Sequence, residues 1–255
     1  MIVTGIAPGS ARALGTERFD RLDVLRALAI VWMALFHFCF DLNHLRLLTP
    51  VQAFTLDPFW TMQRTCIVSL FLFFAGLSQA VALGAGQGWP RFWKRWLQVV
   101  GCAVLVTAGS ALMFPQTYIT FGVLHGLAVM LVLTRLLAPV LGWRAMLPLA
   151  VLCIVLPRVW RHPFFDTPFT NWVGLSTHKP FTEDYVPLLP WLGVMWLGLL
   201  AGQWLLLHRR SWLAGGVPRA VRPLAVLGRW SLSFYMLHQP VFIGVLMGGR
   251  MLGWW

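Results

Sequence analysis

Apolar stretches of membrane-spanning length constrain this chain more than any other feature. A helix needs about 20 apolar residues to cross a hydrocarbon core about 30 Å thick, because its backbone polar groups must bond within the segment. Only 11% of the residues are charged and 58% are hydrophobic, whereas soluble domains carry about 25% charged residues. We therefore predict an all-α, polytopic membrane helix bundle of about seven transmembrane helices, at residues 22–42, 59–83, 93–113, 121–140, 145–158, 187–207 and 223–247.

The basic residues indicate how these spans are oriented. With seven spans, one side of the membrane receives twelve Lys and Arg residues and the other side five, while Arg26, Arg64 and Arg229 lie within spans. Because Lys and Arg concentrate in cytoplasmic loops, we expect a cytoplasmic N-terminus. The net charge of +12 is then a topology signal and a surface for lipid headgroups, and we expect no nucleic-acid partner.

The chain divides into three predicted parts. Residues 1–21 form a cytoplasmic segment without the apolar core of a signal peptide, residues 22–248 a single transmembrane domain, and residues 249–255 a short tail. The long polar connection 159–186 lies on the outer side, and a loop of that length is more often functional than a plain link. The four cysteines lie within apolar spans without CxxC spacing, so we expect neither a disulfide nor a metal site.

Ionisable residues inside the first span point to a chemical site. His37 and Asp41 are four residues apart, so they share one helical face and are expected to touch. A carboxylate beside an imidazole fixes its tautomer and favours the protonated form, which suits a histidine that takes and returns a proton. Two interpretations stay open at this point: a catalytic pair that faces the bundle interior, or a hydrogen-bonded pair that only joins two helices.

Further polar residues collect on the predicted outer side, and this sorting favours the site interpretation. Of the seven histidines, only His208 falls on the cytoplasmic side. Arg64 lies near the outer start of the second span, and His125 lies near the outer start of the fourth. Independent structural histidines would have no reason to sort in this way. The seventh span carries a run of polar side chains: Arg229, Ser231, Ser233, Tyr235, His238 and Gln239.

Two arginines repeat a spacing relative to histidines. Arg26 precedes His37 by eleven residues and Arg229 precedes His238 by nine, so each arginine lies about 14 to 16 Å toward the cytoplasm from its histidine. A long molecule with phosphates at its cytoplasmic end and a reactive tip in the outer half fits this spacing, because arginine pairs well with phosphate. In the alternative, both arginines extend to the inner headgroups.

Five ordered motifs resemble those of a known family: Arg21–Ile30 with Leu35–Leu42, Phe71–Ser78, Phe121–His125, Asp184–Trp191 and Leu227–Pro240. Over about residues 18–245 the chain is similar to bacterial members of the heparan-alpha-glucosaminide N-acetyltransferase catalytic-domain family. The first-helix motif is shared with the broader acyltransferase-3 family. The resemblance implies a membrane-bound acyltransferase of the bacterial inner membrane. It would move an acetyl or other acyl group from cytoplasmic acyl-CoA, such as acetyl-CoA, to an amino-sugar or hydroxyl acceptor on the outer side.

The resemblance also implies a reactive histidine close after the first span. That role falls on His37 or His44, and we prefer His37 because Asp41 lies at helical spacing from it. His37, oriented by Asp41, would deprotonate the acceptor, which then attacks the thioester. Direct transfer and transfer through an acyl-histidine both stay open.

The remaining expected roles concern donor, oxyanion and acceptor. Arg64, His125 or His238 would donate hydrogen bonds to the developing oxyanion. Acetyl-CoA would contact Arg26, Arg64 and Arg229, and the acceptor would contact His44, Glu183 and Asp184. Glu183 and Asp184 have an alternative role, in which they cap the sixth predicted helix at its N-terminus.

Two other functional classes compete with the acyltransferase. A small transporter or proton-coupled permease would use the buried His and Asp groups as a proton relay. Seven spans without an inverted repeat or paired broken helices count against it. A subunit or scaffold of an envelope-glycan complex is a third candidate. Membrane lipids and a glycan or amino-sugar acceptor are the expected partners, and a homo-oligomer stays open.

Overall fold

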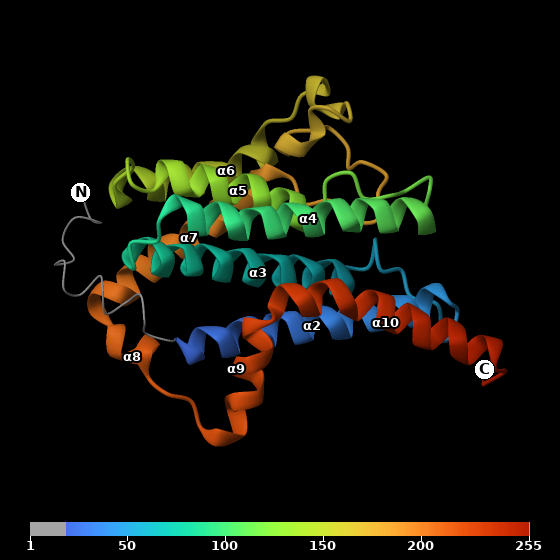
Figure 1. Ribbon diagram of the computed structural model, residues 1–255. Helices are drawn as coiled ribbons and strands as arrows, with labels where there is room; N and C mark the ends of the chain where they lie inside the picture. The colour runs from blue at the N-terminus through green and yellow to red at the C-terminus, as the bar shows by residue number, and fades with distance from the viewer. Residues whose placement is uncertain (1–18, 255) are drawn as a thin grey trace. The chain divides into compact units, whose positions relative to one another are not determined.

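The computed structural model describes residues 19–254, and within that range it is helical without a strand (Figure 1). Of the predicted N-terminal segment 1–21, all but the last three residues lie outside the described residues. Five helices in the described range are long and apolar enough to cross a membrane: α2 (Asp20–His44), α3 (Pro58–Gly84), α4 (Trp89–Met113), α7 (Leu188–His208) and α10 (Ser231–Met251). The predicted all-α membrane fold is therefore confirmed.

Shorter helices complete the described chain. α5 (Val123–Leu137) and α6 (Trp143–Val159) lie between α4 and α7 in sequence. α8 (Arg210–Ala214) and α9 (Arg222–Arg229) follow α7, and the connection after α6 contains the 3-10 turns η2 (Pro163–Asp166) and η3 (Asn171–Val173). The first six predicted spans correspond to α2 through α7.

The bounds of the seventh predicted span, residues 223–247, are wrong because the structure divides this stretch into two helices. α9 ends at Arg229, and α10 begins at Ser231 and continues to Met251. The residue between them, Trp230, has a ψ of 21°, which departs from the helical value. Apolar residues occur on both sides of this break, so a hydropathy average does not detect it. α10 alone has the length and composition of a membrane span.

The described chain forms two compact units. Residues 19–71 and 214–254 contain α2, the first half of α3, α9 and α10, and are called the α2–α10 unit below. Residues 72–213 contain the rest of α3 and α4 to α7, and are called the α4–α7 unit.

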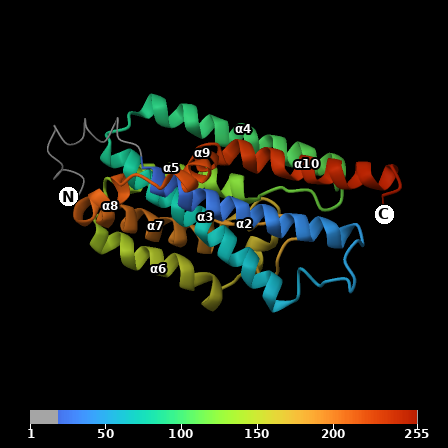
Figure 2. The same ribbon diagram turned by 90° about the horizontal axis from the view of Figure 1, so that it is seen from below.

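A cluster of buried apolar side chains holds the α2–α10 unit together. Its members come from α2, from α3 and from the loop between them: Ile30, Met33, Phe36, Phe54 and Ile67. The Nε1 of Trp32 donates a 3.1 Å hydrogen bond to the Oε1 of Gln63, which ties α2 to α3. α2 and α10 run side by side (Figures 1 and 2). Polar residues on these two helices can therefore meet.

Glycines let the helices of the α4–α7 unit approach one another closely. Gly76 of α3 packs against the carbonyl oxygen of Met195, and Gly198 of α7 packs against the carbonyl oxygen of Phe73. A side chain at either position would collide with backbone, so small residues at both sites permit the close α3–α7 contact. α6 also runs alongside α7 (Figure 2).

Candidate active site

Two pairs of polar side chains connect α2 to α10. Their members on α2 lie one helical turn apart, and their members on α10 are adjacent in sequence. In the first pair, the Nδ1 of His37 lies 2.7 Å from the Nε2 of His238, and the two ring planes differ by 11°. In the second pair, the Nε2 of Gln239 donates a 2.7 Å hydrogen bond to the Oδ1 of Asp41. Asp41 and His238 are each only 6% exposed. His37 and Gln239 are half-buried, so the four side chains form a largely buried polar site between the two helices.

The hydrogen-bond network assigns the protons of the two histidines. The Nδ1 of His238 lies 2.7 Å from the backbone oxygen of Tyr235, and a carbonyl only accepts, so this nitrogen carries the hydrogen. In a neutral ring the Nε2 of His238 is then an acceptor, and the Nδ1 of His37 donates to it. The Nε2 of His37 keeps its lone pair and has no partner among the described residues. His37 is therefore arranged to accept a proton at Nε2.

The expected direct contact between His37 and Asp41 is wrong. The hydrogen bonds of these two side chains in the described part of the chain go to α10 and not to each other. Both residues share the predicted helical face, but α10 brings His238 and Gln239 within reach of that face. The orientation of His37 thus comes from His238. A sequence pattern within one helix does not contain these partners, since they lie 201 and 198 residues away.

Two of the predicted donor-binding arginines meet at one carboxylate. Arg26 donates a 2.7 Å hydrogen bond to the Oδ1 of Asp23, and the Nε of Arg229 lies 3.6 Å from its Oδ2. Arg229 also donates a 2.9 Å hydrogen bond to Asp20. The structure thus brings together two arginines that are 203 residues apart in sequence, at a place about 16 Å along α2 from His37. Two aspartates balance their charge.

The other two predicted residues of the α2–α10 unit, His44 and Arg64, take no part in the hydrogen bonds between α2 and α10 described above. His44, in the last turn of α2, packs against Phe40 with 6.3 Å between ring centroids. Arg64 of α3 is half-buried, and it forms no hydrogen bond or ion pair among residues 19–254.

His125 lies in the α4–α7 unit, where both ring nitrogens have partners. Its Nδ1 accepts a hydrogen bond from the backbone N–H of Gly122 at 3.3 Å. Its Nε2 lies 3.1 Å from the hydroxyl of Thr107, and that hydroxyl donates to the carbonyl of Ile119 at 2.8 Å. Nε2 is therefore the protonated nitrogen. These contacts fix the start of α5 against α4.

Glu183 and Asp184 also lie in the α4–α7 unit. Asp184 accepts a 2.7 Å hydrogen bond from the backbone N–H of Val123, which is the first residue of α5. It therefore caps α5 and not the sixth predicted helix, which is α7. Glu183 accepts a 2.5 Å hydrogen bond from the hydroxyl of Thr117. Asp184 therefore caps a helix, as the alternative prediction expected, but the helix is α5 and not α7.

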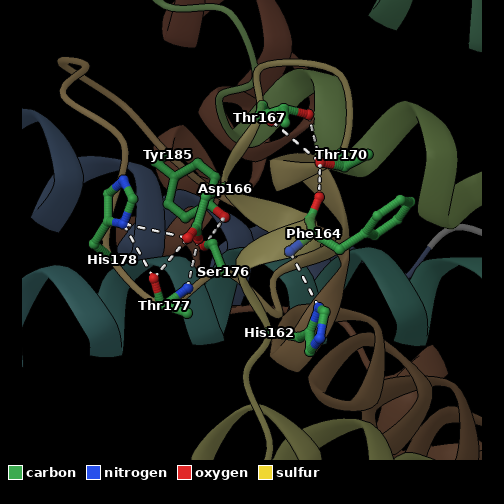
Figure 3. A network of polar contacts seen from close by, with 9 residues as sticks. All are labelled: His162, Phe164, Asp166, Thr167, Thr170, Ser176, Thr177, His178 and Tyr185. Atoms are coloured by element: carbon green, nitrogen blue, oxygen red, sulfur yellow. Dashed lines mark hydrogen bonds and ion pairs between the residues drawn. The ribbon is translucent and has the colours of Figure 1, made fainter.

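The long connection after α6 is held by a polar network that the sequence did not reveal (Figure 3). Asp166 accepts hydrogen bonds from the backbone N–H and the hydroxyl of Thr177, each at 2.7 Å, and lies 3.6 Å from His178. The Thr177 hydroxyl bond is the main cause that lowers the pKa of Asp166. Burial raises the pKa of Tyr185, whose hydroxyl donates to the carbonyl of Asn171 at 2.6 Å.

Sequence reasoning assigned no role to Tyr235 or Gln239, although both lie in the polar run of α10. Their only sequence signal is proximity to His238. Asp20 and Asp23 were also missed as partners of the arginines. A buried amide and a backbone carbonyl become recognisable as site groups only when the opposite helix is known.

Comparison with known families relates this site to a class of enzymes. Residues 18–240 match the family described as heparan-alpha-glucosaminide N-acetyltransferase, catalytic. No curated protein and no solved structure matches the chain. The matched range includes all of α2 and the part of α10 that carries His238 and Gln239. Because the match covers most of the chain, the protein belongs to the heparan-alpha-glucosaminide N-acetyltransferase catalytic-domain family and is a membrane acetyltransferase.

Proposed function

We propose that the protein transfers an acetyl group from cytoplasmic acetyl-CoA to an amino-sugar or hydroxyl acceptor on the outer side of the membrane, with His37 as the general base. The observation that carries this proposal is the ordered chain from His37 through His238 to the Tyr235 carbonyl. It leaves one basic nitrogen, the Nε2 of His37, without a partner among the described residues. A general base needs such a lone pair within reach of the acceptor proton.

His238 supports this role by accepting from the opposite side of the His37 ring. When Nε2 takes a proton, His37 becomes an imidazolium with two N–H groups, and the Nδ1–H already points at the Nε2 of His238. Hydrogen bonds to the charged form stabilise it. His238 is itself fixed by the Tyr235 carbonyl, so the accepting lone pair does not rotate away. The arrangement resembles the base and orienting group of other acyl-transfer sites.

The donor side of the proposal rests on the arginines. Arg26 and Arg229 meet at Asp23, and their guanidinium groups remain partly exposed, at 29% and 39%. Phosphates of acetyl-CoA would bind there in competition with Asp20 and Asp23. Arg64, with no protein partner among the described residues, would bind the oxyanion or the donor. The excess of basic residues in the N-terminal and even-numbered predicted loops supports a cytoplasmic donor side.

Radiolabelled acetyl transfer tests the proposal directly. The purified protein would be incubated with [¹⁴C]acetyl-CoA and glucosamine, and labelled product would be separated from donor. His37→Ala should lower the transfer rate by about 10²- to 10⁴-fold, the usual contribution of a general base. The bound acetyl-CoA, measured by equilibrium dialysis, should change little.

His208→Ala is the matched control, because His208 is exposed at the end of α7. It should retain the parental rate. If folded His37→Ala protein transferred acetyl groups as fast as this control, the base would lie elsewhere and His44 would be the next histidine to replace. Solute flux across proteoliposomes without acetyl transfer would favour the transporter class instead.

A further inference from the structure

Exposed cations at the start of α4 have no acidic partner. Lys94 and Arg95 follow Arg91 by three and four residues in the first two turns of α4, so the three share one helical side, called the basic face of α4 below. All three side chains are exposed, and none forms an ion pair or a hydrogen bond among residues 19–254. Positive charges at the N-terminal end of a helix oppose its dipole. The basic face therefore does not stabilise α4 itself.

The same end of the α4–α7 unit carries further basic residues. Arg135, near the end of α5, donates a hydrogen bond to the backbone oxygen of Gln87, and its guanidinium lies 5.0 Å from the ring centroid of Trp89. These contacts hold the end of α5 at the start of α4. Arg144 is exposed in the first turn of α6, which begins at this end as well (Figure 1).

The positive charge at this end is not balanced within the unit. No Asp or Glu occurs from residue 58 to residue 165. The three acids of the unit all lie beyond α6, in the connection to α7: Asp166, Glu183 and Asp184. They bond to other residues there. An anionic partner of the basic face must therefore come from outside the unit.

The surface of α4 that continues from the basic face is apolar and exposed. Leu105 and Leu112 follow Lys94 by three and five helical turns, so they lie on the same side of the helix. They are 63% and 86% exposed, and only 6% of the apolar part of α4 is buried. Exposed apolar surface of this extent in a membrane protein contacts the hydrocarbon of lipids. The basic face thus lies at one end of a lipid-facing surface.

The length of α4 and its tryptophans place the basic face at the level of the headgroups. α4 has 25 residues and extends about 37 Å, which exceeds a hydrocarbon core of about 30 Å. Trp89 and Trp93 are exposed beside the basic residues, and their ring centroids lie 5.9 Å apart. Tryptophan concentrates at the membrane–water interface. The anions available at this depth are the phosphates of lipids.

We propose that the basic face of α4, together with Arg144, binds the headgroup phosphates of anionic phospholipids. A phospholipid carries acyl chains that can lie along Leu105 and Leu112, whereas a soluble phosphate has no counterpart for this apolar surface. Phosphatidylcholine binds more weakly, because its choline cation accompanies the phosphate and is repelled by the basic residues. This lipid binding is separate from the proposed acetyl transfer and does not depend on it.

Lipid titration of the purified full-length protein tests the proposal. Dioleoylphosphatidylglycerol or dioleoylphosphatidylcholine would be added in a nonionic detergent, with bound lipid counted by native mass spectrometry and Tm measured in parallel. Phosphatidylglycerol should bind more tightly and raise Tm more. Arg91→Gln/Lys94→Gln/Arg95→Gln should weaken its binding on the order of 100-fold, about fivefold for each cation, and should lose most of the Tm rise. Without lipid the triple variant should keep the parental Tm, since its side chains have no partner in the described chain.

Two control variants separate this face from charge in general. Arg91→Lys/Arg95→Lys keeps the positive charges and should keep phosphatidylglycerol binding. Arg219→Gln/Arg222→Gln removes exposed charges from the α2–α10 unit and should also keep it. Undiminished binding by the triple variant, or an equal loss in the second control, would overturn the assignment to α4. An equal Tm rise with inorganic phosphate would show a soluble-anion site and would overturn the lipid as its ligand.

Discussion

In the proposed mechanism, His238 would affect the reaction through the proton position on His37 and not through contact with the acceptor. Its ring is buried among Phe234, Tyr235 and Phe242, and its two nitrogens are occupied by the Tyr235 carbonyl and by His37. These two contacts determine which nitrogen of His37 is basic. Second hydrogen-bond partners of this kind commonly fix the tautomer of a working histidine.

A pair of substitutions at this residue separates positioning from packing. His238→Leu should lower kcat at least about tenfold, because His37 loses the acceptor that holds its tautomer, while KM for acetyl-CoA stays near the parental value. His238→Gln should restore much of the rate, since its amide oxygen can accept from His37 and its N–H can donate to Tyr235. Steady-state kinetics of both variants would measure the split.

If His238 only fills space in the core, we expect the opposite order for the same two variants. Leucine fills the apolar pocket better than glutamine does, so His238→Leu would then be the more stable and the more active of the two. If the order of rates followed the order of Tm, His238 would not be a positioning residue.

At this scale the sequence singled out His37 and Asp41 but did not identify their hydrogen-bond partners. The spacing of His37 and Asp41 and their place within an apolar span were enough to single them out. The partner of each was misjudged, because the nearest candidate along one helix was Asp41 for His37, whereas packing brings in α10. Burial of Asp41 and the unpaired Gln239 oxygen likewise follow from that packing. Contacts between helices about 200 residues apart carry no local signal.

The short helix α9 is the element that hydropathy missed, and one glycine controls how closely it approaches α2. A Cβ at Gly228 would collide with the backbone of Asp23, including its Cα at 3.0 Å. Asp23 is also the carboxylate that pairs with Arg26 and Arg229. The glycine therefore permits both the α2–α9 contact and the arginine cluster.

Gly228→Ala should destabilise the protein by about 1 to 3 kcal/mol, since backbone must shift to admit one methyl group. Thermal unfolding in detergent would measure this as a lower Tm. Gly244→Ala is the matched control: a methyl group added at Gly244, within α10, would meet no atom within 4 Å, so alanine there should be neutral or slightly stabilising. Equal Tm values for the two variants would mean that α9 does not pack on α2 in this way.

Hydropathy located the other elements well, for a physical reason. α2, α3 and α4 are single apolar helices, and α7 is one apart from a kink at Leu189 near its start, so their length alone marks them. The break at Trp230 is not marked by hydropathy in the same way. It separates α10 from α9, and α9 packs against α2.

Across the whole molecule, the ten residues singled out from the sequence divide between the two compact units. Arg26, His37, Asp41, His44, Arg64, Arg229 and His238 belong to the α2–α10 unit, and His125, Glu183 and Asp184 belong to the α4–α7 unit. Within the first unit the histidines form a network with an unpaired basic nitrogen. Within the second unit the same residue types fasten a helix end. Sequence alone treats these groups alike, and only their partners distinguish them.

The division of the last span gives the membrane topology a sharper test. Green fluorescent protein, which fluoresces in the cytoplasm, would be fused after Gly216, after Trp230 and after Trp255. Fusions at the first two positions should fluoresce, and the last should not, because α10 alone has the properties of a span and the predicted cytoplasmic side carries twelve basic residues against five. The middle fusion is the informative one, since residue 230 lies inside the uninterrupted span 223–247 but before α10. Fluorescence of the Trp255 fusion would reverse the orientation of α10, and with it the argument that the donor approaches from the arginine end of the site.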